Sequence, residues 1–116
     1  LNLEGVVFRP VHFKPYYGRL EGSELNGVQV HITDFEKVEL MTIQFYAMQE
    51  LHKMYPDKDV FEMGEKNGRI SMFDKVCGTD RIRKAFSERY MVEDILPILQ
   101  EDMQEFMAVA RTYFLY

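Results

Sequence analysis

The chain opens with alternating hydrophobic and polar residues, the pattern of a β-strand. Residues 5–13, GVVFRPVHF, are rich in β-branched and aromatic side chains and predict a strand. Pro10 lacks the N–H that a strand ladder needs, so we expect this strand at a sheet edge or interrupted by a bulge. Residues 14–27, dense in glycine and polar residues, predict a long loop of the kind that is often functional.

A second strand is expected at residues 26–34, NGVQVHITD, where hydrophobic and polar positions again alternate. One face is predicted to point into the core and consists of Val28, Val30 and Ile32. The other face is polar and consists of Gln29, His31 and Thr33. This polar face either meets water or lines a site, and the pattern alone leaves both open.

A long helix follows, because hydrophobic residues then recur at a helical spacing for about five turns. They are Val38, Met41, Phe45, Met48, Leu51 (or His52) and Tyr55. Asp34 is expected to cap the start of this helix, since a carboxylate there accepts otherwise unpaired backbone N–H groups. Pro56 ends the pattern.

Short elements are expected after the long helix. Residues 59–63 predict a short strand, and the Asn67-Gly68 pair that follows predicts a turn. Residues 72–80 predict a single helical turn that Gly78 closes.

Two further helices complete the predicted elements. Thr79 or Asp80 is expected to cap a short helix. Its inward residues are Ile82 and Phe86. The last helix is expected to begin near Val92, but Pro97 falls in its early turns and predicts a kink or a start delayed to Leu96. The side chains that it is expected to bury are Ile95, Leu99, Met103, Phe106 and Ala110.

The order of these elements predicts an α+β fold in a single domain, residues 1–116. The small sheet is expected to be mostly antiparallel and to pack with the long helix, the short helix and the C-terminal helix. The terminal YFLY, residues 113–116, is compatible with a closing strand.

The composition indicates a globular domain without a basic surface. Of the 116 residues, 47% are hydrophobic and 28% are charged, values near the averages for folded proteins. A net charge of −5 argues against nucleic-acid binding. No hydrophobic run approaches the ~18 residues of a membrane-spanning helix. The chain starts with Leu1 and enters a strand pattern almost at once, which we interpret as a piece of a longer polypeptide.

The pattern alone identifies no catalytic centre. His12 and His31 lie in the two predicted strands and are candidate neighbours if these strands pair, but no short-spaced cluster supplies further zinc ligands. The adjacent carboxylates at 93–94 and 101–102 are expected on the polar side of the last helix, not as an acid/base pair. Cys77, the single cysteine, excludes an internal disulfide and is interpreted as a small buried side chain. We expect neither a metal nor a cofactor.

Three side chains are candidates for binding. Tyr16 and Tyr17 lie in the predicted loop, where their amphipathic rings can stack on the C–H face of a sugar or fold back as a lid on the core. Arg9 can hold a carboxylate with two hydrogen bonds, or be an ordinary exposed strand residue.

Four segments together match one family pattern, in the right order and over nearly the whole chain. They are GVVFRPVHFKP (5–15), GVQVHITD (27–34), FDKVCGTDRIR (73–83) and the terminal YFLY. In this combination the chain resembles the C-terminal part of the NamZ-type exo-β-N-acetylmuramidases, a bacterial family long of unknown function.

The resemblance implies a two-domain glycoside hydrolase that removes N-acetylmuramic acid from peptidoglycan fragments in cell-wall recycling. A larger, Rossmann-like N-terminal domain would carry the catalytic carboxylates, and this chain would complete the substrate cleft beside it. The chain alone is then expected to be inactive, and the full-length protein to be periplasmic or secreted. Its expected partners are that N-terminal domain and a muramic-acid-containing glycan, without nucleic acid or a membrane span.

The resemblance also gives the polar strand a role. The matched positions there are Gln29, His31, Thr33 and Asp34. They are expected to meet the partner domain or the sugar cleft, and Arg9 is the candidate partner of the lactyl carboxylate of muramic acid. The alternative is a non-catalytic module that binds glycan through the loop with Tyr16 and Tyr17, or an interdomain interaction module without a ligand.

Overall fold

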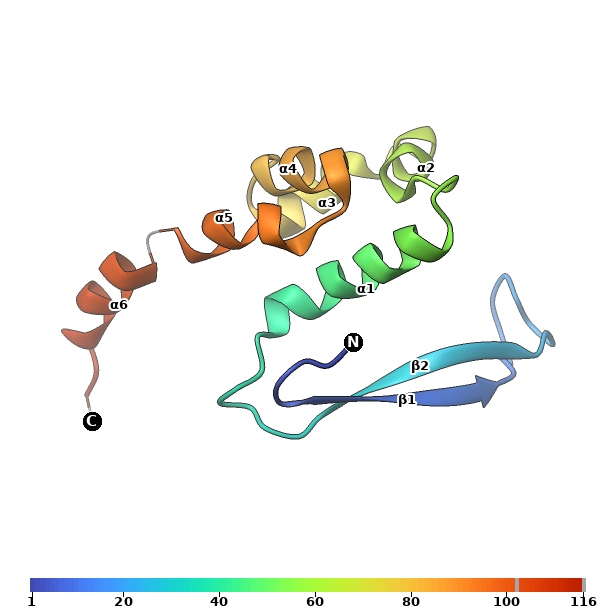
Figure 1. Cartoon of the computed structure of the whole chain (residues 1–116), viewed down its shortest axis with the longest axis horizontal. Coiled ribbons are helices and arrows are strands. Elements are labelled where there is room, and N and C mark those ends of the chain that lie inside the picture. Colours follow the sequence, from blue (N-terminus) through green and yellow to red (C-terminus); the bar gives the residue numbers. More distant parts are fainter. Residues whose placement is uncertain (102, 116) are drawn as a thin grey trace. The chain divides into compact units, whose positions relative to one another are not determined.

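A computed structural model describes residues 1–101 and 103–115, and its fold is α+β, as predicted (Figure 1). The chain divides into two compact units, Leu1–Leu40 and Met41–Tyr116, and each is described here by itself. The expectation that residues 1–116 form a single domain stays a prediction. None of the helices in the described part is long and apolar enough to cross a membrane.

The first unit is built on an antiparallel hairpin of β1 (Val6–Phe13) and β2 (Leu25–Ile32), joined by a loop at residues 14–24. The strand pairing is unbroken along both strands. The strand β2 starts one residue earlier and ends two residues earlier than predicted. In a sheet of two strands both strands are edges, which confirms the edge position expected for Pro10.

The predicted core face of β2 is wrong for Val28 and Val30, whereas Ile32, opposite the buried Val6, is half-buried. Val28 is 63% exposed and Val30 44% exposed, although both lie on the same face of the hairpin as Phe8 and Pro10. Strand alternation determines which side chains share a face, but it does not provide a second layer to cover that face.

At the end of the hairpin where β1 starts and β2 ends, Gly5 is hydrogen-bonded to the residues that follow β2. The Gly5 carbonyl oxygen accepts hydrogen bonds from the backbone N–H groups of Thr33 (2.9 Å) and Asp34 (3.4 Å). Gly5 has φ +74°, and a Cβ there would lie 2.6 Å from the Asp34 carbonyl oxygen, so only glycine fits. Asp34 does not cap the long helix, because its carboxylate accepts the N–H of Glu36 (3.0 Å) several residues before that helix begins at Leu40.

The long helix is confirmed as α1 (Leu40–Met54), but its buried face is rotated from the predicted one. Phe45 is fully buried as expected, whereas Met41 and Leu51 are about half exposed. The buried neighbours of Phe45 on α1 are polar, Thr42 and Gln49. The helical period therefore predicted the helix but not the direction of the core, because polar residues occupy part of the buried face.

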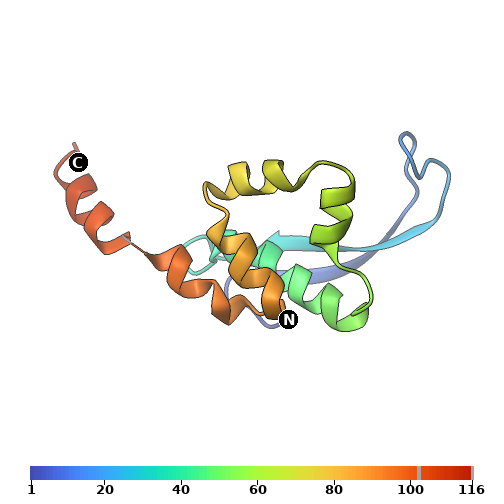
Figure 2. The same ribbon diagram turned by 90° about the horizontal axis from the view of Figure 1, so that it is seen from above.

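Three helices follow, and Figure 2 shows the chain reversing after the second of them. They are α2 (Val60–Lys66), α3 (Ile70–Cys77) and α4 (Arg81–Arg89). The strand predicted at 59–63 is wrong, because the Asp59 carboxylate caps a helix there by accepting the N–H groups of Phe61 (2.8 Å) and Glu62 (3.0 Å). The predicted turn is confirmed, with Gly68 at φ +64° after α2.

The hydrophobic core of the second unit is aromatic. Phe45 of α1 packs edge-on against Phe86 of α4, with ring centroids 5.3 Å apart, and Phe61 of α2 packs similarly against Phe73 of α3 at 5.1 Å. The remaining core residues are Ile82, Tyr90, Val92 and Ile95. The inward positions predicted for Ile82 and Phe86 are confirmed.

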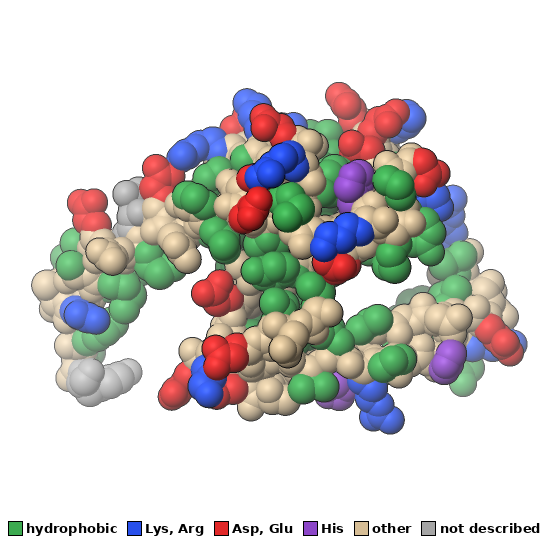
Figure 3. Space-filling view, in the orientation of Figure 1, with side chains coloured by type: hydrophobic (Ala, Val, Ile, Leu, Met, Phe, Trp, Pro, Cys, Tyr) green, Lys and Arg blue, Asp and Glu red, His purple; other side chains and the backbone are tan. Residues whose placement is uncertain are grey.

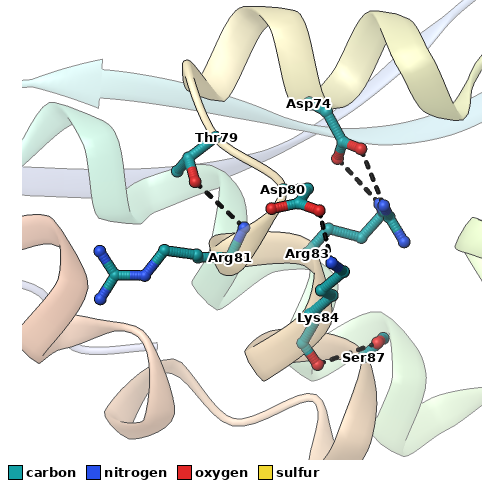
Figure 4. Close-up of polar contacts among 7 residues, drawn as sticks. All are labelled: Asp74, Thr79, Asp80, Arg81, Arg83, Lys84 and Ser87. Atoms are coloured by element: carbon teal, nitrogen blue, oxygen red, sulfur yellow. Dashed lines mark hydrogen bonds and ion pairs between the residues drawn. The ribbon is translucent and has the colours of Figure 1, made fainter.

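The segment FDKVCGTDRIR forms the α3–α4 corner (Figure 4). Gly78 ends α3 at φ +76°, as predicted, and the Thr79 hydroxyl accepts the N–H of Arg81 at 3.2 Å. The Asp74 carboxylate accepts two hydrogen bonds of 2.8 Å from the Arg83 guanidinium, and this pairing lowers the pKa of Asp74. The segment thus joins two helices through a paired corner, and α3 is a full helix of two turns, not the single turn predicted.

The last predicted helix is three elements: η1 (Val92–Asp94), α5 (Leu96–Gln100) and α6 (Met103–Arg111). The start delayed to Leu96 is confirmed, and Ile95 is buried. The helix is not continuous, since Glu101 adopts ψ 136° and ends α5. Consequently Met103 and Phe106, predicted to be buried, are 53% and 68% exposed.

The terminal strand is also wrong for the described residues. Tyr113 lies in a turn, and Phe114 and Leu115 form neither strand nor helix. Tyr116, and Asp102 of the predicted carboxylate pair, lie outside the described residues.

A buried amide joins α1 to the 3₁₀ turn. Gln49 is 9% exposed, and its Oε1 accepts the backbone N–H of Val92 at 2.9 Å, a bond between residues far apart in sequence. Val92 is itself buried, so this N–H has no access to water if the amide is lost.

We predict that Gln49→Met destabilises the chain by about 1–3 kcal/mol, because a buried donor is left unpaired while the side-chain volume is kept. Urea denaturation followed by circular dichroism measures this loss. Gln44→Met, at an exposed position on the same helix, is the matched control and should change the free energy of unfolding by less than about 0.5 kcal/mol. Equal effects of the two variants would contradict the role of the Gln49 amide.

A second polar contact ties α4 to the start of α2. The Tyr90 hydroxyl donates to Asp59 Oδ1 at 2.7 Å. Burial disfavours the charged form of Asp59, but hydrogen bonds from the Glu62 N–H, the Tyr90 hydroxyl and the Phe61 N–H outweigh burial and lower its pKa below 3.8. Burial and the Asp59 contact together raise the pKa of Tyr90.

We predict that Asp59→Asn lowers the free energy of unfolding by about 1 kcal/mol near neutral pH. The amide oxygen can still accept hydrogen bonds from the three donors, but the negative charge that strengthens these bonds is lost. Because the folded pKa of Asp59 is lowered, its charge stabilises the fold above the ordinary carboxyl pKa, and that contribution disappears as the pH falls through the folded value. The difference in unfolding free energy between the two proteins, measured in urea from pH 6 to pH 2.5, should therefore shrink with acid. A constant or growing difference would contradict this account.

Candidate functional site

The strand register gathers three of the predicted site residues on one face of the hairpin. Arg9 lies directly opposite Gln29, and Val7 lies opposite His31. Directly opposed residues of an antiparallel pair point to the same side, with Cβ atoms roughly 5 Å apart. All of these side chains are exposed, so the polar face predicted for β2 exists and the first strand adds a guanidinium to it.

The loop tyrosines point into water. Tyr16 is 92% exposed and Tyr17 is 86% exposed, so they do not fold back as a lid on the core. The loop is held by its own backbone, because the Gly22 N–H donates to the Pro15 carbonyl oxygen at 3.1 Å. A shallow pocket of about 190 Å³ beside Tyr16 is lined by Lys14, Pro15, Glu21 and Gly22.

The predicted site residues do not form one constellation. The strand β1 continues from Arg9 to Phe13, roughly 13 Å, before the loop with the tyrosines begins. The structure thus brings Arg9, Gln29 and His31 together and leaves Tyr16 and Tyr17 at the loop end of the hairpin.

Thr33 and Asp34 have structural contacts at the other end of the hairpin. The backbone N–H groups of both residues donate to Gly5, and the Asp34 carboxylate lies 3.7 Å from the Lys37 ammonium. These contacts close the hairpin and its following turn. Whether either side chain also meets a ligand or a partner stays a prediction.

The described residues contain no group of three metal-ligating side chains. His12 and His31 are not neighbours: His12 lies opposite Asn26, hydrogen-bonds to its side chain, and points to the other face of the hairpin. Cys77 is half-buried, and burial, together with the Asp74 carboxylate, raises the pKa of its thiol. A raised pKa is the opposite of what a nucleophilic cysteine needs.

The second unit carries a pocket that the sequence pattern did not indicate. It has a volume of about 180 Å³, and its wall includes the stacked rings of His52 and Tyr90, 3.9 Å apart. Its remaining lining is mostly apolar, and His52 Nδ1 is buried without a hydrogen-bond partner among the described residues. The Asp59-x-x-Glu62 spacing, typical of a helix start, is a sequence signal for the start of α2, whose Val60 and Met63 line this pocket.

The comparisons with known proteins agree with the sequence motifs. The model of the family "Exo-beta-N-acetylmuramidase NamZ, C-terminal" matches residues 1–116. The chain is 29% identical, over its whole length, to the peptidoglycan beta-N-acetylmuramidase NamZ of Bacillus subtilis (strain 168), of which it covers 27%. It is also similar to the crystal structure of a DUF1343 family protein from Bacteroides fragilis NCTC 9343, with a TM-score of 0.89, 46% identity, and coverage of 98% of this chain and 29% of that one.

The family match extends over every residue of the chain, and the four sequence segments fall within it in order. This chain therefore belongs to the NamZ exo-β-N-acetylmuramidase family and corresponds to its C-terminal part.

Proposed function

We propose that this chain acts as the C-terminal domain of a peptidoglycan-degrading exo-β-N-acetylmuramidase, in which the polar face of its hairpin completes the substrate cleft. The catalytic carboxylates would lie on an N-terminal domain of the same polypeptide. The substrate would be a muramic-acid-containing glycan, and the protein would work in the periplasm or outside the cell.

The observation that carries this proposal is the Arg9–Gln29–His31 face. It presents a permanent positive charge beside an amide and an imidazole, all on one face of the hairpin and all exposed. N-acetylmuramic acid offers a carboxylate, hydroxyl groups and an acetamido group. A guanidinium binds a carboxylate with two parallel hydrogen bonds, and amide and imidazole groups hydrogen-bond to hydroxyls.

The electrostatics of the carboxyl groups support catalysis outside this chain. A glycosidase general acid needs a raised pKa. Among the described residues, the carboxyls whose pKa is altered are Glu50, Asp59, Asp74 and Asp80, and all four values are lowered. Lysine or arginine partners cause three of these shifts, and backbone and tyrosine donors cause the fourth, so all four groups are held as structural anions.

We predict that Arg9→Ala in the full-length enzyme raises KM for muramic-acid substrates about tenfold, with a smaller change in kcat, because a charged hydrogen-bond pair is lost in the ground state and the transition state alike. Steady-state kinetics on a peptide-free disaccharide whose muramic acid keeps a free lactyl carboxylate measures this. The increase should vanish with a substrate whose lactyl carboxylate is amidated.

Arg69→Ala is the matched control, since it removes one exposed arginine from the second unit. It should leave KM unchanged. An unchanged KM for Arg9→Ala would refute the carboxylate contact.

The exposure of Tyr16 and Tyr17 favours a second candidate function, a glycan-binding module that does not depend on another domain. Both rings are almost entirely in water and adjacent in sequence, so each is available to stack on the C–H face of a sugar.

NMR titration of the chain with N-acetylmuramic acid and with a muropeptide disaccharide separates the two functions. For the cleft-completing function we predict small shifts at Arg9, Gln29 and His31, and none at the loop. Shifts centred on Tyr16 and Tyr17, and abolished in a Tyr16→Ala/Tyr17→Ala double variant, would instead establish the binding module. A spectrum that stays unchanged at millimolar ligand would exclude an independent subsite in this chain.

A further inference from the structure

The helix α6 presents a continuous hydrophobic face that the chain itself does not bury. Met103, Phe106, Met107 and Ala110 recur at spacings of three and four residues and so lie along one side of the helix. Figure 3 shows hydrophobic side chains on the surface of this helix. Met103, Phe106 and Met107 are 53%, 68% and 38% exposed, and no residue of α6 in the described part belongs to the hydrophobic core.

The exposed surface continues beyond the helix. Tyr113, Phe114 and Leu115 are 77%, 61% and 92% exposed. We call these three residues together with Met103, Phe106, Met107 and Ala110 the α6 surface. Soluble proteins rarely leave so many large hydrophobic side chains of one short segment uncovered, and exposed hydrophobic patches mark interaction sites.

We propose that the α6 surface docks onto the part of the family's polypeptide that lies outside this chain, and so anchors the C-terminal part to the larger remainder. The chain covers only 27% of the Bacillus relative and 29% of the Bacteroides structure, so most of such a polypeptide is available to cover it. This inference rests on the two-part architecture of the proposed function, but not on glycan binding by the hairpin.

The geometry of α6 fits this role. Glu101, with ψ 136°, ends α5, so the direction of α6 is not continued from the core helices. The side away from the hydrophobic face bears Gln104, Glu105 and Ala108. This distribution is typical of a helix that packs one face against an apolar partner and exposes the other face to water.

Methionine oxidation tests the proposal, because Met103 and Met107 are built-in probes of the α6 surface. Peptide-level oxidation rates with hydrogen peroxide are compared between the full-length protein and residues 1–116, with the urea-unfolded proteins as the reference. We expect Met103 and Met107 to react at least fivefold more slowly in the full-length protein.

Two variants of the full-length protein sharpen the test. Phe106→Glu should bring the oxidation rates of Met103 and Met107 to within twofold of those in residues 1–116 and lower the Tm. Ala108→Glu introduces the same charge on the opposite side of α6 and should change neither. If Phe106→Glu fails to fold, the comparison of the two wild-type proteins still decides the proposal.

Three results would overturn it. Equal rates in the full-length protein and in residues 1–116 would mean that nothing outside the chain covers α6. Slow oxidation in residues 1–116 at every concentration would mean that the chain covers its own helix. Protection of residues 1–116 that grows with concentration would identify a second copy as the occupant. Muramidase activity, assayed on the same samples, separates these outcomes from failure of the proposed function, because protection without activity leaves the docking intact.

Discussion

The hydrogen bond from the Val92 N–H to the buried Gln49 amide is the constraint on which the second unit depends. It fixes the 3₁₀ turn against the middle of α1, and this turn carries Val92 and Ile95 into the core beside Phe45 and Phe86. A hydrophobic contact in that position would tolerate sliding, whereas a single buried donor and acceptor specify one arrangement. The amide thus accounts for a polar residue at a position where the helical pattern calls for a hydrophobic one.

The family segment FDKVCGTDRIR has a similar structural purpose. Its Asp74–Arg83 pair is about four-fifths buried on both sides and bidentate, so it sets the angle between α3 and α4 while Gly78 reverses the chain. The reversal brings Phe73 and Phe86 to the same aromatic cluster. A segment this specific in sequence can therefore identify a family without containing any catalytic group.

The elements that the sequence predicted well are those with a local cause. Gly78 requires a left-handed conformation, α1 has a sustained helical period, and the hairpin has alternation with Pro10 at an edge. The misses have non-local causes. Residues 59–63 contain strand-forming side chains, but the cap at Asp59 and its contact with Tyr90, 31 residues away, favour a helix. For the candidate site, alternation predicted the polar face of β2, while the position of Arg9 opposite Gln29 depends on a pairing register that the spacing alone does not define.

The exposed surfaces of both units have one physical reason. An isolated two-stranded hairpin is marginally stable in water, yet β2 leaves Val28 and Val30 uncovered, and α6 leaves Phe106 uncovered. Burying such side chains is the main favourable term in folding and in association, so the side chains left exposed here are available to stabilise an association. The chain covers 27% of the Bacillus relative and 29% of the Bacteroides structure, so the proposed docking would cover these side chains with another part of the same polypeptide. Under the proposed function the two kinds of exposed surface have different tasks: hydrophobic groups of α6 supply the attachment to the rest of the polypeptide, and polar groups of the hairpin face the substrate.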